Sequence, residues 1–244
     1  MADLEFFGHI VDNEEVESID GKRFDVWNPW KREVWAQAAE GGEKDADRAI
    51  TSARKAFDEG PWPRMGRVER AKMIHKLADL MEARADEIAT LDSTNMAKPF
   101  EQAKHDVARS VWNFRFFADH QRDSVGEVYP MDSGHHSYSE FGPAGVVAAI
   151  SPWNFPLMMA SWKIAPAIAW GNTCIIKPSE DTPASVTYLG GLAAEAGFPP
   201  GVLNVLNGYG HPAGSAITGD DRVDRVTFTG SSTTGKAVMA SAAT

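Results

Sequence analysis

From residue 143 onward, short uninterrupted apolar runs alternate with segments that have helical periodicity. The apolar runs are 146–150 (VVAAI), 173–177 (TCIIK), 202–206 (VLNVL) and 226–228 (VTF). The helix-capable segments between them are 157–170, 183–196 and 212–218. Strands without polar alternation that are separated by helices indicate βαβ units and a parallel sheet. We therefore predict an α/β fold in which helices flank a parallel sheet over residues 143–244.

Residues 1–123 are predicted to be mainly helical. Short strands and turns occupy residues 1–43 of this part, and the helices follow them. Asp45 is the expected cap of a first helix whose apolar positions fall on one face. That face contains Ala46, Ala49, Ile50, Ala53, Ala56 and Phe57. Two further helices are predicted over 67–91 and 100–120.

Residues 124–142 (SVGEVYPMDSGHHSYSEFG) interrupt the helical period. They are typical of two short strands around a turn at Asp132–Gly134. Such a hairpin has few apolar residues for a core of its own. We expect it to pack on something else, for example on another subunit.

Composition and charge narrow the class of protein. The chain has 244 residues, of which 43% are hydrophobic and 24% charged, and its net charge is −10. An acidic balance argues against nucleic acid as a partner, and the longest apolar runs are too short to span a membrane. The acidic N-terminus lacks the basic start of a secretory signal. A single cysteine excludes an intrachain disulfide and favours a reducing, cytoplasmic setting.

Distinctive residues follow each predicted strand of the sheet. They are 151–156 (SPWNFP), 177–180 (KPSE), 207–214 (NGYGHPAG) and 229–235 (TGSSTTG). Ligands of parallel sheets bind beyond the carboxyl ends of the strands. The coincidence predicts a nucleotide-type ligand at this edge, with turn formation alone as the alternative.

The last of these turns contains G-x-x-x-x-G-K over Gly230–Lys236. An ATP-type loop requires Ser or Thr after the lysine to ligate magnesium, and this chain has Ala237. The turn can still direct backbone N–H groups at a phosphate. The segment 208–214 resembles G-x-G-x-x-G but is one residue too long, so it is a weak signal.

Three side chains at these turns could carry chemistry. Lys177 could reach a ribose or a phosphate, and Glu180 could accept hydrogen bonds from a ribose diol. The alternative is a solvated Lys–Glu pair. Asn154, held between two prolines, could donate to an oxyanion, or could form only a local turn bond.

The single thiol is not expected to be a nucleophile. Cys174 lies within an apolar strand, where a free cysteine behaves as a small buried hydrophobe. The seven histidines form no metal-binding spacing, so no metal site is expected.

Taken together, these motifs resemble the NAD(P)-dependent aldehyde dehydrogenase superfamily. The matching stretches are 56–64, 142–183, 197–210 and 226–235. Within the family, 113–120 (NFRFFADH) and the region of SPWNFPLMMASWKIAP look most like enzymes that oxidise hydroxymuconic-type semialdehydes, with betaine-aldehyde-type members as the alternative.

The resemblance implies three parts: a mainly helical part of the cofactor-binding domain over 1–123, an oligomerisation hairpin over 124–142, and a Rossmann-like NAD-binding part over 143–244. It implies NAD rather than NADP as cofactor, an aldehyde as substrate and a homo-oligomer. Asn154 would be the oxyanion amide, and Lys163 would lie near the active centre. The implied cofactor-binding residues are Ser151, Trp153, Lys177, Glu180, Gly210, Gly214, Phe228, Thr229, Gly230, Ser231 and Thr234. His211 stands where many members have proline.

In the family, a cysteine thiolate attacks the aldehyde to form a thiohemiacetal, and a glutamate assists hydrolysis. We expect both residues, and the catalytic domain, to lie beyond Thr244, so that this chain is an N-terminal portion that is inactive alone. Two other hypotheses remain at this point: a short non-catalytic NAD-binding or interaction protein, and a P-loop NTPase.

Overall fold

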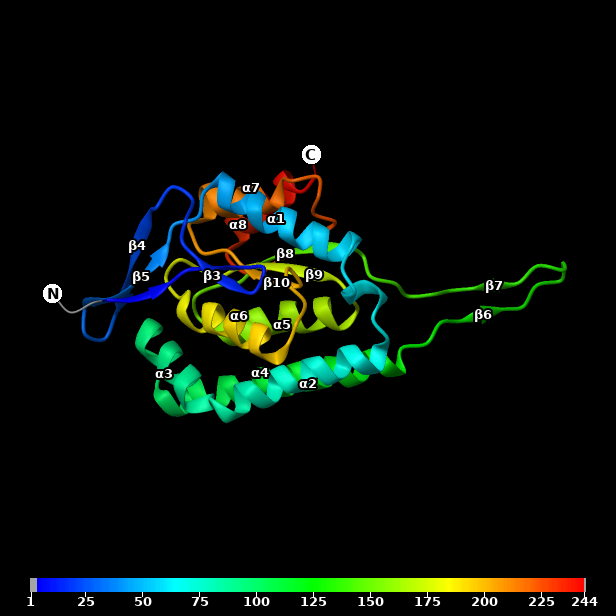
Figure 1. Ribbon diagram of the computed structural model, residues 1–244, viewed down its shortest axis with the longest axis horizontal. Helices are drawn as coiled ribbons and strands as arrows, with labels where there is room; N and C mark the ends of the chain where they lie inside the picture. Colours follow the sequence, from blue (N-terminus) through cyan, green and yellow to red (C-terminus); the bar gives the residue numbers. More distant parts are fainter. Residues whose placement is uncertain (1–3, 244) are drawn as a thin grey trace.

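The computed structural model describes residues 4–243, which build a six-stranded sheet between two layers of helices (Figure 1). The strand order is β11-β8-β9-β10-β2-β3. The first four strands in this order are parallel: β8 (Val146–Ile150), β9 (Thr173–Lys177), β10 (Leu203–Val205) and, at the edge, β11 (Arg225–Phe228). These strands match the predicted ones, and the α/β fold is confirmed.

The sheet continues beyond β10 into two antiparallel strands from the start of the chain. These are β2 (His9–Val11) and β3 (Glu14–Val16), and Ile10 pairs with Val205. A separate three-stranded sheet contains β1 (Glu5–Phe7), β5 (Glu33–Ala39) and β4 (Arg23–Asn28). The sequence predicted short strands in this region but not that two of them would extend the parallel sheet.

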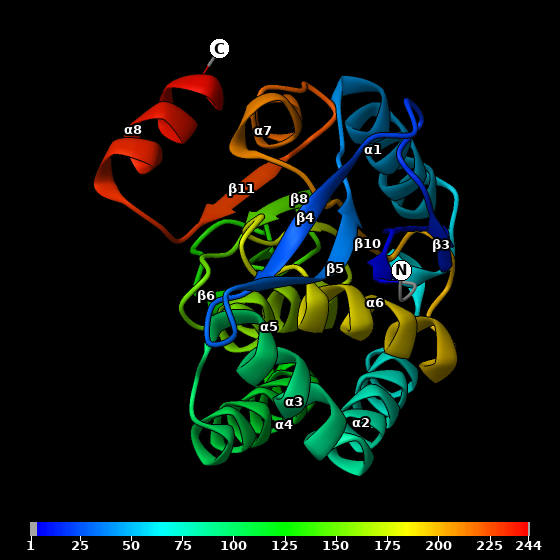
Figure 2. The same cartoon turned by 90° about the vertical axis from the view of Figure 1, so that its left-hand side faces the viewer.

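Successive residues of the central strands face opposite sides, and both sides are buried. Val147 and Ala149 pack in a core with α5 (Pro156–Ala169) and α6 (Ala184–Ala196). Val146 and Ala148 pack on the other side against α1 (Glu43–Asp58) and α7 (Ser215–Thr218). Burial on both faces explains why these strands are apolar without alternation. The last helix, α8 (Ser232–Ser241), stands at the β11 edge with no buried residue (Figure 2).

A second helical layer covers α5 and α6 on the side away from the sheet (Figure 2). It contains α2 (Arg67–Ala83), α3 (Ala85–Met96) and α4 (Phe100–Asp123), and the short η1 (Trp62–Arg64) precedes it. The prediction of a single helix over 67–91 was wrong. The backbone of Arg84 leaves helical geometry (φ −113°, ψ 26°), so α2 ends there and α3 begins. The Arg84 carbonyl accepts the N–H of Ile88 in the first turn of α3.

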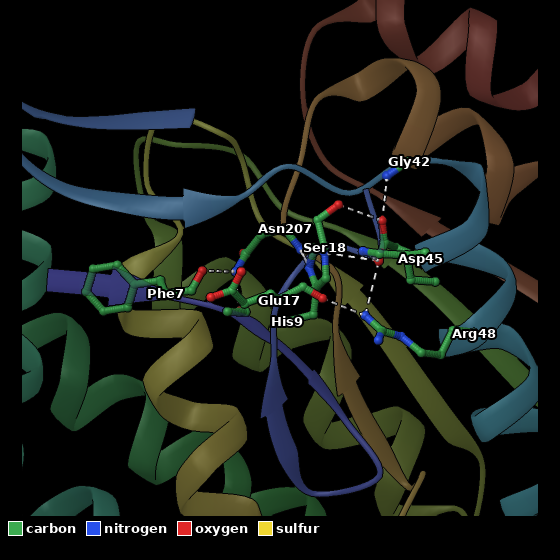
Figure 3. Close-up of polar contacts among 10 residues, drawn as sticks. Phe7, His9, Glu17, Ser18, Gly42, Asp45, Arg48 and Asn207 are labelled. Atoms are coloured by element: carbon green, nitrogen blue, oxygen red, sulfur yellow. Dashed lines mark hydrogen bonds and ion pairs between the residues drawn. The ribbon is translucent and has the colours of Figure 1, made fainter. Parts of the chain in front are cut away.

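Asp45 is not the cap of α1, which corrects the sequence prediction. Gly42 is the N-cap, and Asp45 lies three residues later, with its carboxylate accepting the Gly42 N–H at 3.0 Å. The same carboxylate accepts from Ser18 Oγ and from the Ile19 N–H (Figure 3). A carboxylate at this position reaches back to the N-cap, and here it also ties α1 to the N-terminal strands.

Residues 124–142 form the predicted hairpin. Its strands β6 (Val128–Tyr129) and β7 (Ser137–Tyr138) pair antiparallel and project from the body of the molecule (Figure 1). Several of its large apolar residues are exposed, including Val125, Val128 and Tyr138. Within residues 4–243, no helix is both long and apolar enough to cross a membrane.

Candidate functional site

A cavity of about 830 Å³ opens beyond the carboxyl ends of β8, β9 and β11. Twelve of the thirteen predicted site residues line it: Ser151, Trp153, Asn154, Lys177, Glu180, Gly210, Gly214, Phe228, Thr229, Gly230, Ser231 and Thr234. The thirteenth, Lys163, lies behind the wall. The topology therefore brings together turns that are up to about 80 residues apart in the chain.

The turn after β8 presents Asn154 at the cavity. The Ser151 N–H donates to the Lys177 carbonyl at 3.1 Å, which joins this turn to the one after β9. Pro156 occupies the first position of α5, where its missing N–H costs nothing. The Asn154 amide is exposed and has no hydrogen-bond partner within residues 4–243. It makes no local turn bond and can donate to a ligand.

Below this turn lies a buried ion pair. Lys98 donates to Asp106 at 2.5 Å, and both side chains are about 95% buried. The Lys98 ammonium also lies over the Phe155 ring. Nearby, burial raises the pKa of Asp92 to about 6, against the opposing effects of Ser185 and Lys98. Three ionisable side chains from α3, α4 and the segment between them therefore underlie the start of α5.

Lys177 ends β9 with its side chain 98% buried. Its ammonium donates to the Pro178 carbonyl at 2.8 Å and to Glu180 at 3.4 Å. Burial lowers the pKa of Lys177, and the Glu180 carboxylate opposes that shift. A Cβ on Gly214 would lie 3.4 Å from the Lys177 stem, so the glycine turn packs against it. Lys177 is therefore a fixed, buried cation rather than half of a solvated surface pair.

The turn after β11 leads directly into α8. Ser231 is the N-cap of that helix, and its hydroxyl accepts the Thr234 N–H at 3.1 Å. A Cβ at Gly230 would lie 2.5 Å from the Phe228 ring, so only glycine fits without moving the ring. This geometry directs the first N–H groups of α8 at the cavity, where an anion would be stabilised. Ala237, which lines the same cavity, offers no hydroxyl for a magnesium ion.

Lys163 contacts the cavity wall through Thr229. Its ammonium donates to the Thr229 hydroxyl at 2.5 Å, and its side chain is 93% buried. Burial lowers the pKa of Lys163. The pair ties α5, which begins just after Asn154, to the turn that follows β11.

Cys174 lies in the middle of β9 and is fully buried, as predicted. Burial raises the pKa of its thiol to about 12, although the charge of Lys163 opposes the shift. A thiol in this environment remains protonated at neutral pH and is a poor nucleophile.

Several polar residues that were not predicted as site residues also line the cavity: Ser179, His211, Ser215, Thr218 and Thr233. Ser179 and Thr233 lie inside motifs that were recognised, so their positions at strand ends could have identified them. Ser215 and Thr218 belong to a short helix whose inward face the sequence pattern does not reveal.

These features fit a dinucleotide. The cavity volume lies within the usual range for cofactor sites. Its polar groups are divided between a buried lysine beside a carboxylate and a helix start that favours phosphate. Ser151 adds a buried hydroxyl that has no hydrogen-bond partner among the described residues.

Comparison with known proteins points in the same direction. The profile of the "Aldehyde dehydrogenase family" matches residues 16–244. "Aldehyde dehydrogenase family 2 member B4, mitochondrial" from Arabidopsis thaliana is 40% identical over 96% of this chain and 44% of its own length. "Aldehyde dehydrogenase" from Emericella nidulans is 43% identical over 97% and 47%.

A solved structure shows the same likeness in three dimensions. The NAD⁺ complex of aldehyde dehydrogenase from Bacillus cereus superposes with a TM-score of 0.96 at 42% identity, covering 98% of this chain and 49% of that one. The chain thus spans about half the length of the relatives it matches.

Proposed function

Because the chain belongs to the aldehyde dehydrogenase family, we propose that it supplies the NAD site and the oxyanion amide of an enzyme that oxidises an aldehyde to a carboxylic acid. The observation that carries the proposal is the meeting of Asn154, the Lys177–Glu180 pair and the Gly230–Ser231 turn in one cavity. In the proposed reaction NAD⁺, when bound, accepts a hydride from the substrate.

Each part of the cavity has a distinct role in the proposal. Lys177 and Glu180 hold the adenosine ribose through its hydroxyls. The Gly230–Ser231 turn holds the pyrophosphate at the start of α8. Asn154 donates its amide N–H to the oxygen of the aldehyde as that oxygen gains negative charge. Ser151, Trp153 and Phe228 form the remaining wall, and Lys163 fixes Thr229.

We propose NAD rather than NADP because of Glu180. Its carboxylate lines the cavity beside Lys177 and would repel a 2′-phosphate. The Bacillus cereus structure is an NAD⁺ complex, which supports this choice.

The proposed substrate is a hydroxymuconic-type semialdehyde, with a betaine-type aldehyde as the alternative. Protein from the natural source, assayed with both aldehydes and NAD⁺, tests this choice. A higher kcat/KM is expected for the semialdehyde. A higher kcat/KM for betaine aldehyde would instead favour the betaine-type aldehyde as the substrate.

We further propose that the 244-residue polypeptide does not oxidise aldehydes by itself. Its single thiol is Cys174, which is buried and protonated. On its own the polypeptide would be a cofactor-binding protein. Aldehyde-dependent NADH formation by this polypeptide would contradict the proposal and would return Cys174 to consideration.

The exposed hairpin β6–β7 is proposed to join copies of the protein into a homo-oligomer. Its apolar residues lack cover within the described chain, and its strands have unpaired outer edges. The reducing compartment favoured by the single cysteine is proposed to be the cytoplasm.

Cofactor binding by the purified 244-residue chain is the direct test of the proposed site. Titration with NADH, followed by nucleotide fluorescence, is expected to saturate, and NADPH is expected to bind more weakly. A Ser231→Pro variant removes the hydroxyl that caps α8 and is expected to weaken both. The control Ser133→Pro changes the hairpin turn, far from the cavity. If the wild-type chain shows no saturable binding, the proposed NAD site is wrong.

A further inference from the structure

The turn between β10 and α7 places a histidine at the rim of the cofactor cavity. His211 lies near the start of η2 (Gly210–Gly214), where its own backbone is extended (φ −124°, ψ 129°) and kinks the turn, and it lines the cavity with Gly210, Gly214 and Ser215. Its side chain is exposed rather than buried in the core. The resemblance predicts proline here, so an imidazole in this position is a feature of this chain.

Hydrogen bonds orient the imidazole ring and select its tautomer. Ser215 Oγ lies 2.9 Å from the Pro212 carbonyl and 2.9 Å from His211 Nδ1. A carbonyl can only accept, so the hydroxyl satisfies both contacts by donating to Pro212 and accepting from Nδ1–H. The proton of the neutral ring is therefore on Nδ1, and Nε2 is a bare acceptor.

Nε2 is the atom that remains for a ligand. Within residues 4–243 it has no hydrogen-bond partner. An oriented ring with one nitrogen held by the protein and the other bare is suited to accept one hydrogen bond from a bound molecule.

The position of His211 indicates which part of the dinucleotide it meets. This step rests on the proposed function, in which Lys177–Glu180 hold the ribose and Gly230–Ser231 hold the pyrophosphate. The base must then lie farther along the cavity, against Gly210 and its neighbours. Adenine carries an exocyclic amine, which is a hydrogen-bond donor.

We propose that His211 is a specificity-determining residue that recognises the adenine base of the cofactor, with Nε2 accepting a hydrogen bond from the exocyclic amine. A base that carries a carbonyl oxygen in place of that amine would set two acceptors against each other. The site would therefore bind hypoxanthine and guanine dinucleotides more weakly than adenine dinucleotides.

The test compares NAD⁺ with nicotinamide hypoxanthine dinucleotide, in which a carbonyl oxygen replaces the amine. Affinities of the 244-residue chain are measured by calorimetric titration of each. Wild type is expected to favour NAD⁺ by about tenfold, the size of one hydrogen bond gained against one unpaired acceptor.

Two substitutions separate the hydrogen bond from the shape of the ring. His211→Phe keeps a ring without an acceptor and is expected to bind both dinucleotides within about twofold of each other. His211→Gln can present either its amide oxygen or, after the amide turns over, its N–H2, so it is expected to bind both dinucleotides with similar affinity. His136→Phe, in the hairpin, is the matched control and keeps the wild-type preference. Melting curves establish that each variant is folded.

The outcomes distinguish this inference from the proposed function. If His211→Phe prefers NAD⁺ as strongly as wild type does, the inference is wrong while the cofactor site stands. If wild type binds the two dinucleotides equally well, the inference is also wrong. If wild type binds neither, the proposed cofactor site fails and the inference fails with it.

Discussion

The ammonium group of Lys98 lies 4.1 Å from the centre of the Phe155 ring, and Phe155 directly follows Asn154. The same ammonium is paired with Asp106 in α4. Asn154, the proposed oxyanion amide, is therefore followed in its turn by a residue that packs over the buried ammonium of Lys98. The segment between α3 and α4 supports the site without lining the cavity.

Replacing Lys98 with methionine is expected to lower the free energy of unfolding by about 3–5 kcal/mol, because Asp106 would be left buried without its partner. Urea unfolding measures the loss. The exposed pair of Lys72 and Glu69 provides the control, since Lys72→Met should change stability little. The double variant Lys98→Met/Asp106→Leu is expected to regain much of the loss. If Lys98→Met alone unfolds like wild type, the ion pair does not support the fold.

His9 predicts a specific loss of stability in acid. Burial lowers its pKa to about 4, with Asp45 opposing and Arg48 adding to the shift. The Asn207 N–H donates to His9 Nδ1, so protonation would place two donors face to face (Figure 3). Because the folded pKa lies below the unfolded value of 6.5, the contribution of His9 is complete above pH 6.5. It is lost as the pH falls towards 4, by about 3 kcal/mol.

The variant His9→Asn tests this expectation, because the amide oxygen can accept from Asn207 but cannot titrate. Unfolding free energies of wild type and variant are compared from pH 7.5 to pH 4 (about six points suffice to define the slope). The variant is expected to be less stable at neutral pH, yet to lose about 3 kcal/mol less than wild type over this range. His75→Asn, at an exposed ion pair with Asp119, is the control. Parallel curves for wild type and His9→Asn would contradict the assignment.

The effect of adding a methyl group should differ sharply between two glycines. A Cβ at Gly230 would lie 2.5 Å from the Phe228 ring, which itself lines the cavity. Gly230→Ala is therefore expected to move that ring and to weaken NADH binding by about tenfold. A Cβ at Gly191, in α6, would meet nothing within 4 Å. Gly191→Ala should raise stability by up to about 1 kcal/mol and leave NADH binding unchanged. Equal NADH affinities for the two variants would contradict the close packing at Gly230.

The sequence predicted the parts of the fold that depend on local pattern. Strands β8, β9 and β10 are largely apolar because both of their faces are buried, and this property is visible in the residues themselves. The residues that line the cavity follow from the same pattern, because parallel strands align their carboxyl ends.

Features that depend on distant pairing could not be predicted in this way. The pairing of Ile10 with Val205 joins strands from opposite ends of the chain, and short strands carry no signal for their partners. In the sequence, Lys98 and Asp106 look like ordinary charged surface residues, so their buried pairing could not be predicted. The break at Arg84 occurs without glycine or proline, so the periodicity of 67–91 appears continuous.

The charge of Glu180 is expected to decide the choice between NAD and NADP. Glu180 is half-exposed at the cavity and accepts from the buried Lys177 ammonium. Glu180→Gln removes the negative charge but keeps an oxygen for Lys177, so the fold should be preserved. The affinity for NADPH relative to NADH is expected to rise about tenfold, because repulsion of the 2′-phosphate is removed. Fluorescence titration with both nucleotides measures the ratio. Glu195→Gln removes an exposed carboxylate that is paired with Arg84, and it should leave the ratio unchanged. If Glu180→Gln also leaves the ratio unchanged, another part of the cavity excludes the phosphate.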